Sequence, residues 1–145
     1  MADDRTQANE TRVTQAETAS FEPLTIVDIK QTAASVSQAH RNFVLLAVNQ
    51  HSIRIAIMEG EYPWHHHPHS DECFVVLEGE LEIEIAGGET FHIKPWQAFT
   101  VPAGITHRTR ARRRTANLCF EDSRAHTDVT VVDTASSLWS PSLVP

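Results

Sequence analysis

The stretch Pro63-Trp64-His65-His66-His67-Pro68-His69-Ser70-Asp71-Glu72-Cys73-Phe74-Val75-Val76-Leu77-Glu78-Gly79 decides the fold of this chain. It holds four of the nine histidines of the protein, and imidazole is the commonest metal ligand among side chains. His65 and His67 are two residues apart, so on an extended segment both rings leave the same face. Glu72 shares the parity of Phe74 and Val76, which predicts that its carboxylate points inward.

A second stretch, Val101-Pro102-Ala103-Gly104-Ile105-Thr106-His107, places another histidine at the start of a strand. The Pro-x-Gly turn before His107 can direct its ring back to the same interior. Three neutral imidazoles and one carboxylate in one pocket suit a divalent first-row metal. The sequence therefore predicts that His65, His67, Glu72 and His107 bind one divalent transition metal ion per chain.

The rest of the chain alternates with period two, which is typical of half-buried strands. Leu81 to Ile85 alternates without exception, with its glutamates expected in water, and Gly87-Gly88 closes a hairpin after it. Short apolar runs at similar spacing cover 43–48, 52–58, 74–77, 91–93, 99–101, 107–110, 117–121 and 129–132. Residues 21–30 are predicted as a further strand, and 31–42 as a helical turn or a loop. Such a pattern favours an antiparallel sandwich or barrel.

The two stretches resemble the cupin family. His65-x-His67-(x)4-Glu72-(x)6-Gly79 matches the first cupin motif, and Pro102-x-Gly104-(x)2-His107 matches the second. Fixed residue types at so many set positions rarely coincide by chance. The likeness is to small single-domain cupins, in the subgroup of mannose-6-phosphate-isomerase-like proteins and proteins of unknown function. Three positions depart from the family pattern: Gly60 lies one residue too close to His65, Trp96 replaces a glycine, and Ala111 replaces an asparagine.

The resemblance implies an all-β cupin antiparallel β-barrel (a jelly roll, or double-stranded β-helix) with a metal at its centre and an open mouth for a small molecule. Cupins with three histidines and a glutamate commonly bind Fe, Mn, Ni, Cu or Zn. An open coordination position distinguishes a catalytic metal site from a closed structural one. Small cupins usually form dimers, so a homodimer is expected, with residues 21–30 supplying the strand that pairs across it.

Several residues outside the ligand set are candidates for supporting roles. His66 has the opposite parity to the ligand pair, and His69 lies in a turn. Both are expected at the surface or next to the metal ligands, and both are possible alternative ligands, with His69 the main rival to Glu72. Arg54 holds an anionic substrate if its face of the strand is the interior, and is solvated otherwise. The other expected substrate-pocket residues are Phe74, Val76 and Phe99.

Composition narrows the class of protein. The 145 residues fit one domain, predicted at 21–135 between a disordered tail at 1–20 and a C-terminal tail at 136–145. Cys73 and Cys119 make no disulfide framework, no secretory signal begins the chain, and no apolar run has membrane length. These features predict a cytoplasmic protein without a membrane partner.

The net charge of −7 disfavours a nucleic-acid partner. The basic run from Arg108 to Arg114 is then best explained as a solvated hairpin or as a local salt-bridge partner of the acidic strands.

The leading functional hypothesis is a metal-dependent enzyme acting on a small molecule. Dioxygen activation at Fe(II) is the first chemistry, and isomerase or lyase chemistry on a sugar or keto acid is the second. The alternative is a non-catalytic cupin that binds or senses a sugar or another small molecule and keeps its metal for structure. No general acid or nucleophile stands out from the sequence.

Overall fold

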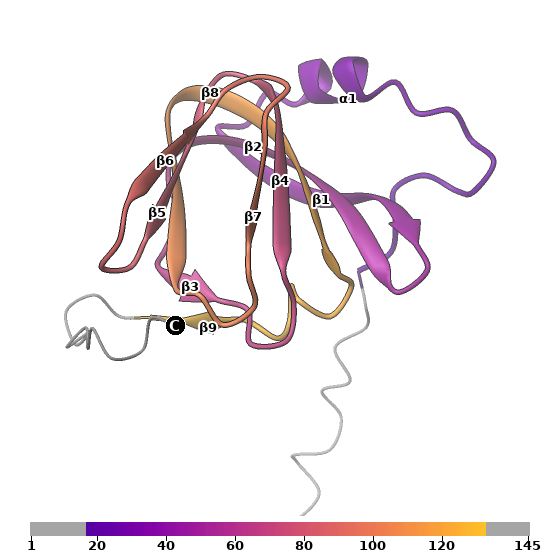
Figure 1. Ribbon diagram of the computed structural model, residues 1–145. Coiled ribbons are helices and arrows are strands. Elements are labelled where there is room, and N and C mark those ends of the chain that lie inside the picture. Colours follow the sequence, from indigo (N-terminus) through magenta and orange to yellow (C-terminus); the bar gives the residue numbers. More distant parts are fainter. Residues whose placement is uncertain (1–16, 133–145) are drawn as a thin grey trace, which may run out of the picture.

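The computed structural model describes residues 17–132 as a curled, mainly antiparallel sheet closed into a barrel, with one short helix outside it in this part of the chain (Figure 1). This confirms the all-β jelly-roll prediction. The elements are α1 (Ile29–Ser35), β1 (His40–Val48), β2 (His51–Glu61), β3 (His65–His66), β4 (Glu72–Glu78), β5 (Leu81–Ile85), β6 (Thr90–Ile93), β7 (Ala98–Val101), β8 (His107–Asp122) and β9 (Thr130–Val131). None of the helices in 17–132 is long and apolar enough to cross a membrane.

The long strand β8 organises the barrel. It pairs with β2 along most of its length, with β5 through its first residues and with β4 through its last ones. Figure 1 shows that β8 starts and ends at the same end of the barrel, where β3, β9 and the beginning of β4 also lie. His107 and Glu121, fourteen positions apart, are therefore brought to one end of the interior.

Two apolar clusters lie on opposite faces of the β2–β8–β4 sheet. The inner cluster fills the barrel with side chains that include Val76, Leu81 and Ile83. The outer cluster joins Ile55 and Ile57 of β2 to Ala33 of α1. The isoleucines of β2 thus face outward, and the alternating residues Arg54, Ala56 and Met58 line the interior.

The segment before the barrel corrects the prediction of a strand at 21–30. Asp28 caps the N-terminus of α1, because its Oδ1 accepts a hydrogen bond from the Gln31 N–H at 2.8 Å. Leu24 has a positive φ of 62°, which interrupts an extended chain just after Pro23. Leu24 and Ile26 are fully exposed, so the apolar alternation was misleading here. Residues 21–30 therefore form no strand within the single chain.

The predicted tails are only partly within the described residues. Residues 1–16 and 133–145 lie outside them, which covers the whole predicted C-terminal tail at 136–145. Residues 17–20 of the predicted tail are described and contact the barrel. Ser20 N–H donates to the Val44 carbonyl at 2.9 Å, and the Glu17 carboxylate contacts Arg54 NH1 at 2.9 Å.

The arginine run forms ion pairs with the neighbouring acidic strand, in line with the local interpretation of its charge. Arg108 and Arg110 lie opposite Glu84 and Glu82 in the β5–β8 register. Their Nε–H groups donate to those carboxylates at 2.7 and 2.6 Å. Glu82 is only 2% exposed because the arginines cover it, which corrects the expectation that it lies in water. A hydrogen bond from Arg112 lowers the pKa of Glu82.

The three departures from the cupin pattern leave the barrel intact. Trp96 adopts φ +66° and is 82% exposed, so it takes the left-handed backbone that favours the glycine of the motif. Gly60 has φ +113° beside a register shift between β2 and β8. Ala111 is buried in the inner apolar cluster. None of these positions supplies a metal ligand.

Candidate metal centre

The four predicted ligands come from four places in the chain that the sheet register brings together. His65 of β3 is the direct cross-strand partner of His107 at the start of β8, and their ring centroids are 4.5 Å apart. His67 follows β3, and Glu72 opens β4. All four side chains are buried. All four side chains therefore lie on the inner face of the barrel, where the sequence predicts them.

The carboxylate of Glu72 is the centre of the cluster. Its Oε2 lies 3.0 Å from Nε2 of His107, 3.2 Å from Nε2 of His67 and 4.0 Å from Nε2 of His65. One ligand atom each from His65, His67 and Glu72 lies within 4.8 Å of the others. These separations match those between atoms that share one metal ion at about 2.0–2.2 Å.

The other ring nitrogen of each histidine is held by a backbone carbonyl. Nδ1 of His65 contacts Pro63 O at 2.8 Å, that of His67 contacts Ala125 O at 2.9 Å, and that of His107 contacts Ile105 O at 2.9 Å. A carbonyl only accepts, so each Nδ1 carries the hydrogen. In the neutral ring the lone pair is then on Nε2, which faces Glu72. Backbone carbonyls commonly orient metal-binding histidines in this way.

This arrangement favours a cation at its centre. Lone pairs of imidazole nitrogens facing a carboxylate oxygen repel one another unless a positive charge lies between them. Nε2 of His67 is buried with no hydrogen-bond partner. A proton on one ring relieves one contact, whereas a divalent metal ion relieves all of them. The residues present therefore fit a metal ion.

Burial and neighbouring charges shift the ionisation of the cluster. Burial lowers the pKa of His65 to about 4, with help from His107, so this ring is neutral at neutral pH. Burial opposes the charge on His67 as well, but the nearby carboxylate of Glu72 outweighs it and raises the pKa of His67. Burial opposes ionisation of Glu72, yet its contacts with His107 and His67 hold its pKa well below the ordinary value. Glu72 is therefore an anion.

A cavity of about 210 Å³ opens beside the cluster. Arg54 and Phe74, two of the predicted pocket residues, line it together with His65, His67 and Glu72. Val76 and Phe99 do not line it. Both pack in the inner apolar cluster. Val76 is fully buried there, and Phe99 stacks on Phe91 with ring centroids 4.6 Å apart.

The two neighbouring histidines have different positions. The side chain of His69 is 78% exposed and lies 3.8 Å from Asp128, so it does not compete with Glu72 for the metal. His66 is half-buried on the opposite side of the strand from His65, and its Nδ1 is buried without a partner. Neither ring joins the cluster around Glu72.

The polar residues at the end of β8 were not among the predicted site residues. Asn117, Cys119 and Glu121 are buried and line the cavity. Glu121 is the direct cross-strand partner of Glu72, an arrangement of like charges that normally destabilises a sheet. Counting by twos from His107 would have found all three residues, since the odd positions of β8 are buried with the exception of Arg113.

Glu121 adds a second carboxylate to the site. Its Oε2 is buried without a hydrogen-bond partner and lies 4.0 Å from Nε2 of His67. Burial and the negative charge of Glu72 raise the pKa of Glu121 to about 7. Glu72, Cys119 and Glu121 form a second group whose ligand atoms lie close together. Burial raises the pKa of the Cys119 thiol well above its usual value, which disfavours the thiolate that a metal requires.

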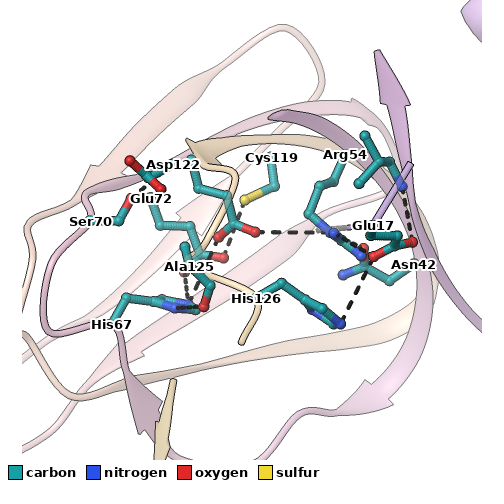
Figure 2. Close-up of polar contacts among 12 residues, drawn as sticks. Glu17, Asn42, Arg54, His67, Ser70, Glu72, Cys119, Asp122, Ala125 and His126 are labelled. Carbon is teal, nitrogen blue, oxygen red and sulfur yellow. Dashed lines mark hydrogen bonds and ion pairs between the residues drawn. The ribbon is translucent and has the colours of Figure 1, made fainter. Parts of the chain in front are cut away.

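Arg54 lies across the cavity from the histidines, within a polar network (Figure 2). Its Nε–H donates to Asn42 Oδ1 at 2.7 Å, and NH1 lies 2.9 Å from Glu17 Oε2. Glu121 Oε1 is farther from Nε, at 3.9 Å. The interior position predicted as one of two alternatives for Arg54 is therefore the observed one.

Comparison with known proteins agrees with this geometry. Residues 53–119 match the model of the Cupin domain family. A curated relative, the uncharacterized protein YdbB of Bacillus subtilis, is 48% identical over 95 residues, which cover 66% of this chain and 84% of YdbB. Polyketide synthase CurC of Streptomyces cyaneus is 41% identical over 46 residues, or 32% of this chain and 29% of CurC.

Solved structures share the fold at low sequence identity. A cupin-2 domain protein of Shewanella frigidimarina superposes with a TM-score of 0.64 at 23% identity, over 67% of this chain and 94% of that one. DMSP lyase DddQ of Ruegeria pomeroyi gives 0.56 at 22% identity, over 65% and 52%. KdgF of Halomonas gives 0.54 at 20% identity, over 61% and 84%. With both motifs, the ligand geometry and these matches in place, the chain belongs to the cupin superfamily.

Proposed function

We propose that the protein is a metal-dependent enzyme that acts on a small molecule in the barrel cavity. The observation that carries this proposal is the convergence of three imidazole Nε2 atoms on the buried carboxylate of Glu72. These atoms come from His65, His67 and His107. His65, His67 and Glu72 line a cavity rather than a closed core. Four protein ligands leave coordination positions for a substrate or water, as in catalytic metal sites.

When bound, a divalent metal supplies a Lewis acid that polarises a substrate oxygen or, as Fe(II), a site for dioxygen. The chain supplies the orientation of that metal through the three carbonyl contacts to Nδ1. Met58 and Phe74 line the cavity with apolar surface and reduce its water content. These features serve either chemistry.

Glu121 favours proton-transfer chemistry, the isomerase or lyase reaction on a sugar or keto acid. A carbon next to a polarised oxygen loses a proton more readily, and a buried carboxylate with a free oxygen is suited to accept it. Glu121 Oε2 is such an atom, 4.0 Å from His67. In this scheme the proton goes to Glu121 Oε2 and returns to the substrate or the leaving group, so no oxidant is needed.

Dioxygen activation at Fe(II) is the second candidate. The imidazole-rich donor set around Glu72 favours it, since nitrogen ligands suit Fe as well as Zn, Ni and Cu. It requires no proton acceptor beyond the metal site. The two candidates differ in which metals support turnover and in their need for Glu121.

The test compares metals and readouts on the same protein. Metal-free protein is loaded without oxygen with Zn(II), Mn(II), Ni(II) or Fe(II) and mixed with small keto acids and sugars in D2O. Nuclear magnetic resonance then follows exchange of the protons next to the carbonyl. Proton transfer predicts exchange with a redox-inert metal, and its loss in Glu121→Gln while the metal stays bound. The matched control, His69→Ala, changes an exposed histidine and keeps the activity.

The outcomes separate the functional classes. Oxygen uptake that depends on substrate, with Fe(II) alone, supports the dioxygenase candidate instead. Tight metal binding without exchange, uptake or product for any tested compound supports the non-catalytic cupin with a structural metal. Failure of every divalent ion to bind contradicts the metal-dependent proposal itself.

A further inference from the structure

The guanidinium of Arg54 is a buried cation in the wall of the metal cavity. The residue is 3% exposed and lines the same cavity as His65, His67 and Glu72. Burying a charge is costly unless a counter-charge and hydrogen bonds compensate for it. The arginines of the 108–114 run, by contrast, are on the outer surface of the barrel or in the β5–β8 ion pairs. The carboxylate that compensates Arg54 is therefore informative about the site.

The barrel itself does not supply the nearest carboxylate. Glu121 lies 3.9 Å from Arg54 Nε, and Asn42 contributes a neutral oxygen. The shortest charged contact, 2.9 Å to NH1, comes from Glu17, which precedes the first strand by more than twenty residues. Figure 2 shows the Glu17 carboxylate against Arg54 on the side of the cavity opposite His67 and Glu72.

Glu17 is held at this place by few other contacts. Its Oε1 accepts from the Val44 N–H at a long 3.4 Å, and its Oε2 is 3.9 Å from His126 Nε2. Its side chain is 37% exposed, and a partly exposed ion pair contributes little net stability. A free carboxylate that reached Arg54 would find the same guanidinium donor, the same backbone N–H and the same imidazole.

We infer that Arg54, with Asn42 and His126 beside it, is the binding site for the carboxylate group of the substrate, and that the carboxylate of Glu17 occupies this site until the substrate displaces it. The ligand class is a short carboxylic acid with a second oxygen, a hydroxyl or keto group, at its other end. The carboxylate binds Arg54 and the second oxygen points toward the His65–His67–Glu72 end of the cavity. A cavity of about 210 Å³ holds on the order of ten water-sized groups, enough for such an acid.

The assignment of the substrate class rests on the proposed function, but its test does not require turnover. The probes are L-lactate and propane-1,2-diol, which differ chiefly by a carboxylate in place of a CH2OH group. Full-length metal-free protein is titrated with each probe, and ¹H–¹⁵N spectra follow the Arg54 Nε–H signal, identified by its absence in Arg54→Lys. Lactate is expected to shift this signal and the diol is not.

Two substitutions in the N-terminal segment then test the displacement. Glu17→Gln removes the competing charge and is expected to lower the dissociation constant of lactate about 2- to 10-fold, in keeping with a partly exposed ion pair. Glu17→Asp, which withdraws the carboxylate by one methylene, is expected to act in the same direction. Glu22→Gln, in the same segment and exposed, is expected to leave lactate binding unchanged. Arg54→Lys weakens it, because an ammonium lacks the guanidinium fork.

The inference is overturned if lactate leaves the Arg54 signal unmoved, or if Glu17→Gln leaves the affinity for lactate at the wild-type value. It is also overturned if the diol gains as much affinity as lactate in Glu17→Gln. Each of these results would mean that the Glu17–Arg54 ion pair only holds the N-terminal segment against the barrel. Since the titration uses metal-free protein, lactate binding at Arg54 in a protein that binds no divalent ion would reject the proposed function and retain the carboxylate site.

Discussion

The two faces of the β2–β8–β4 sheet are both buried, but they are built differently. On the outer face, Ile55, Ile57 and Leu118 pack against Ala33 and its neighbours from the N-terminal segment. At the metal end of the inner face, the same strands present Arg54, Asn117, Cys119 and Glu121. The residues alternate along one strand, so the two faces share the same backbone and differ only in the side chains.

The outer face contributes more to the stability of the fold than the metal end of the inner face. Apolar side chains on the outer face contribute about 25 cal/mol per Å² of buried surface at no polar cost. The inner face keeps Asn117 Oδ1 and Glu121 Oε2 buried without partners, and each such atom costs about 1–3 kcal/mol. Glu72 and Glu121 also lie directly opposite each other. These costs are expected if the inner face serves to bind a metal and a substrate.

The largest effect is expected from removing a metal ligand on the inner face. His107→Ala should weaken binding of Zn(II) or Fe(II) by more than about 100-fold, since even residues behind the ligands change metal affinity about 10- to 100-fold. Competition with a chromophoric chelator measures the affinity. His69→Ala is the matched control and should bind metal as the wild type does, because His69 is 78% exposed. Equal losses in the two variants would break the assignment of ligands.

A deletion on the outer face should affect stability alone. Ile55 is fully buried, so Ile55→Ala is expected to lower the free energy of unfolding by about 2–4 kcal/mol. Urea denaturation measures this change, and the metal affinity of the folded protein should stay at the wild-type value. Val48→Ala, at a half-exposed position of β1, should cost much less. A loss of metal affinity in Ile55→Ala would show that the two faces are not independent.

Comparison of Glu121→Gln with the wild type should show that the buried carboxylate of Glu121 makes the unfolding free energy depend on pH. The pKa of Glu121 is raised from 4.5 to about 7 in the folded protein, so its contribution to stability is complete below pH 4.5 and is lost as pH rises through 7. Glutamine does not titrate. From pH 4.5 to pH 8 the variant should therefore gain about 1–3 kcal/mol in unfolding free energy relative to the wild type.

Urea denaturation of both proteins with a chelator present, at pH 4.5, 6 and 8, measures this difference. Arg54 keeps Glu17 as a partner in the variant. Parallel stability curves over this pH range would mean that Glu121 is solvated, and would remove the contrast between the two faces.

The smallest effect is expected on the outer surface of the barrel. Arg112 donates to Glu82, but its side chain is 75% exposed. Arg112→Ala should change the unfolding free energy by less than about 1 kcal/mol, since Glu82 keeps its hydrogen bond with Arg110. Thermal denaturation at low and high salt, with the exposed neighbour Arg113→Ala as control, checks this. A loss of more than about 2 kcal/mol in unfolding free energy would show that these ion pairs contribute to stability as much as core residues do.

The clustering of the four candidate ligands was predictable because their spacing and parity are local properties of the sequence. His65 and His67 share a face by alternation, and the turn before His107 returns it to the same interior. The barrel was predictable for the same reason, from repeated apolar alternation. The cupin motifs then connected the two segments, which no local rule does.

Other parts depended on tertiary structure. Arg54 and Ile55 alternate in one strand, and the sequence does not say which of the two faces inward. In the structure the isoleucines face outward and pack against Ala33 of α1. Residues 21–30 alternate like a strand, but Asp28 caps a helix there. Glu17 reaches Arg54 from a segment without a motif, and the role of Glu121 follows from its register opposite Glu72. Such long-range pairings carry no signal in a single sequence.

The central claim is that one metal ion is bound by three imidazoles and the Glu72 carboxylate. X-ray absorption spectroscopy of the Zn(II)- or Fe(II)-loaded protein tests it most directly. The predicted result is a first shell of nitrogen and oxygen at about 2.0–2.2 Å with outer scattering from three imidazole rings. A sulfur scatterer at about 2.3 Å would place the metal at the group of Glu72, Cys119 and Glu121. That result, or a shell without imidazole, would contradict the account.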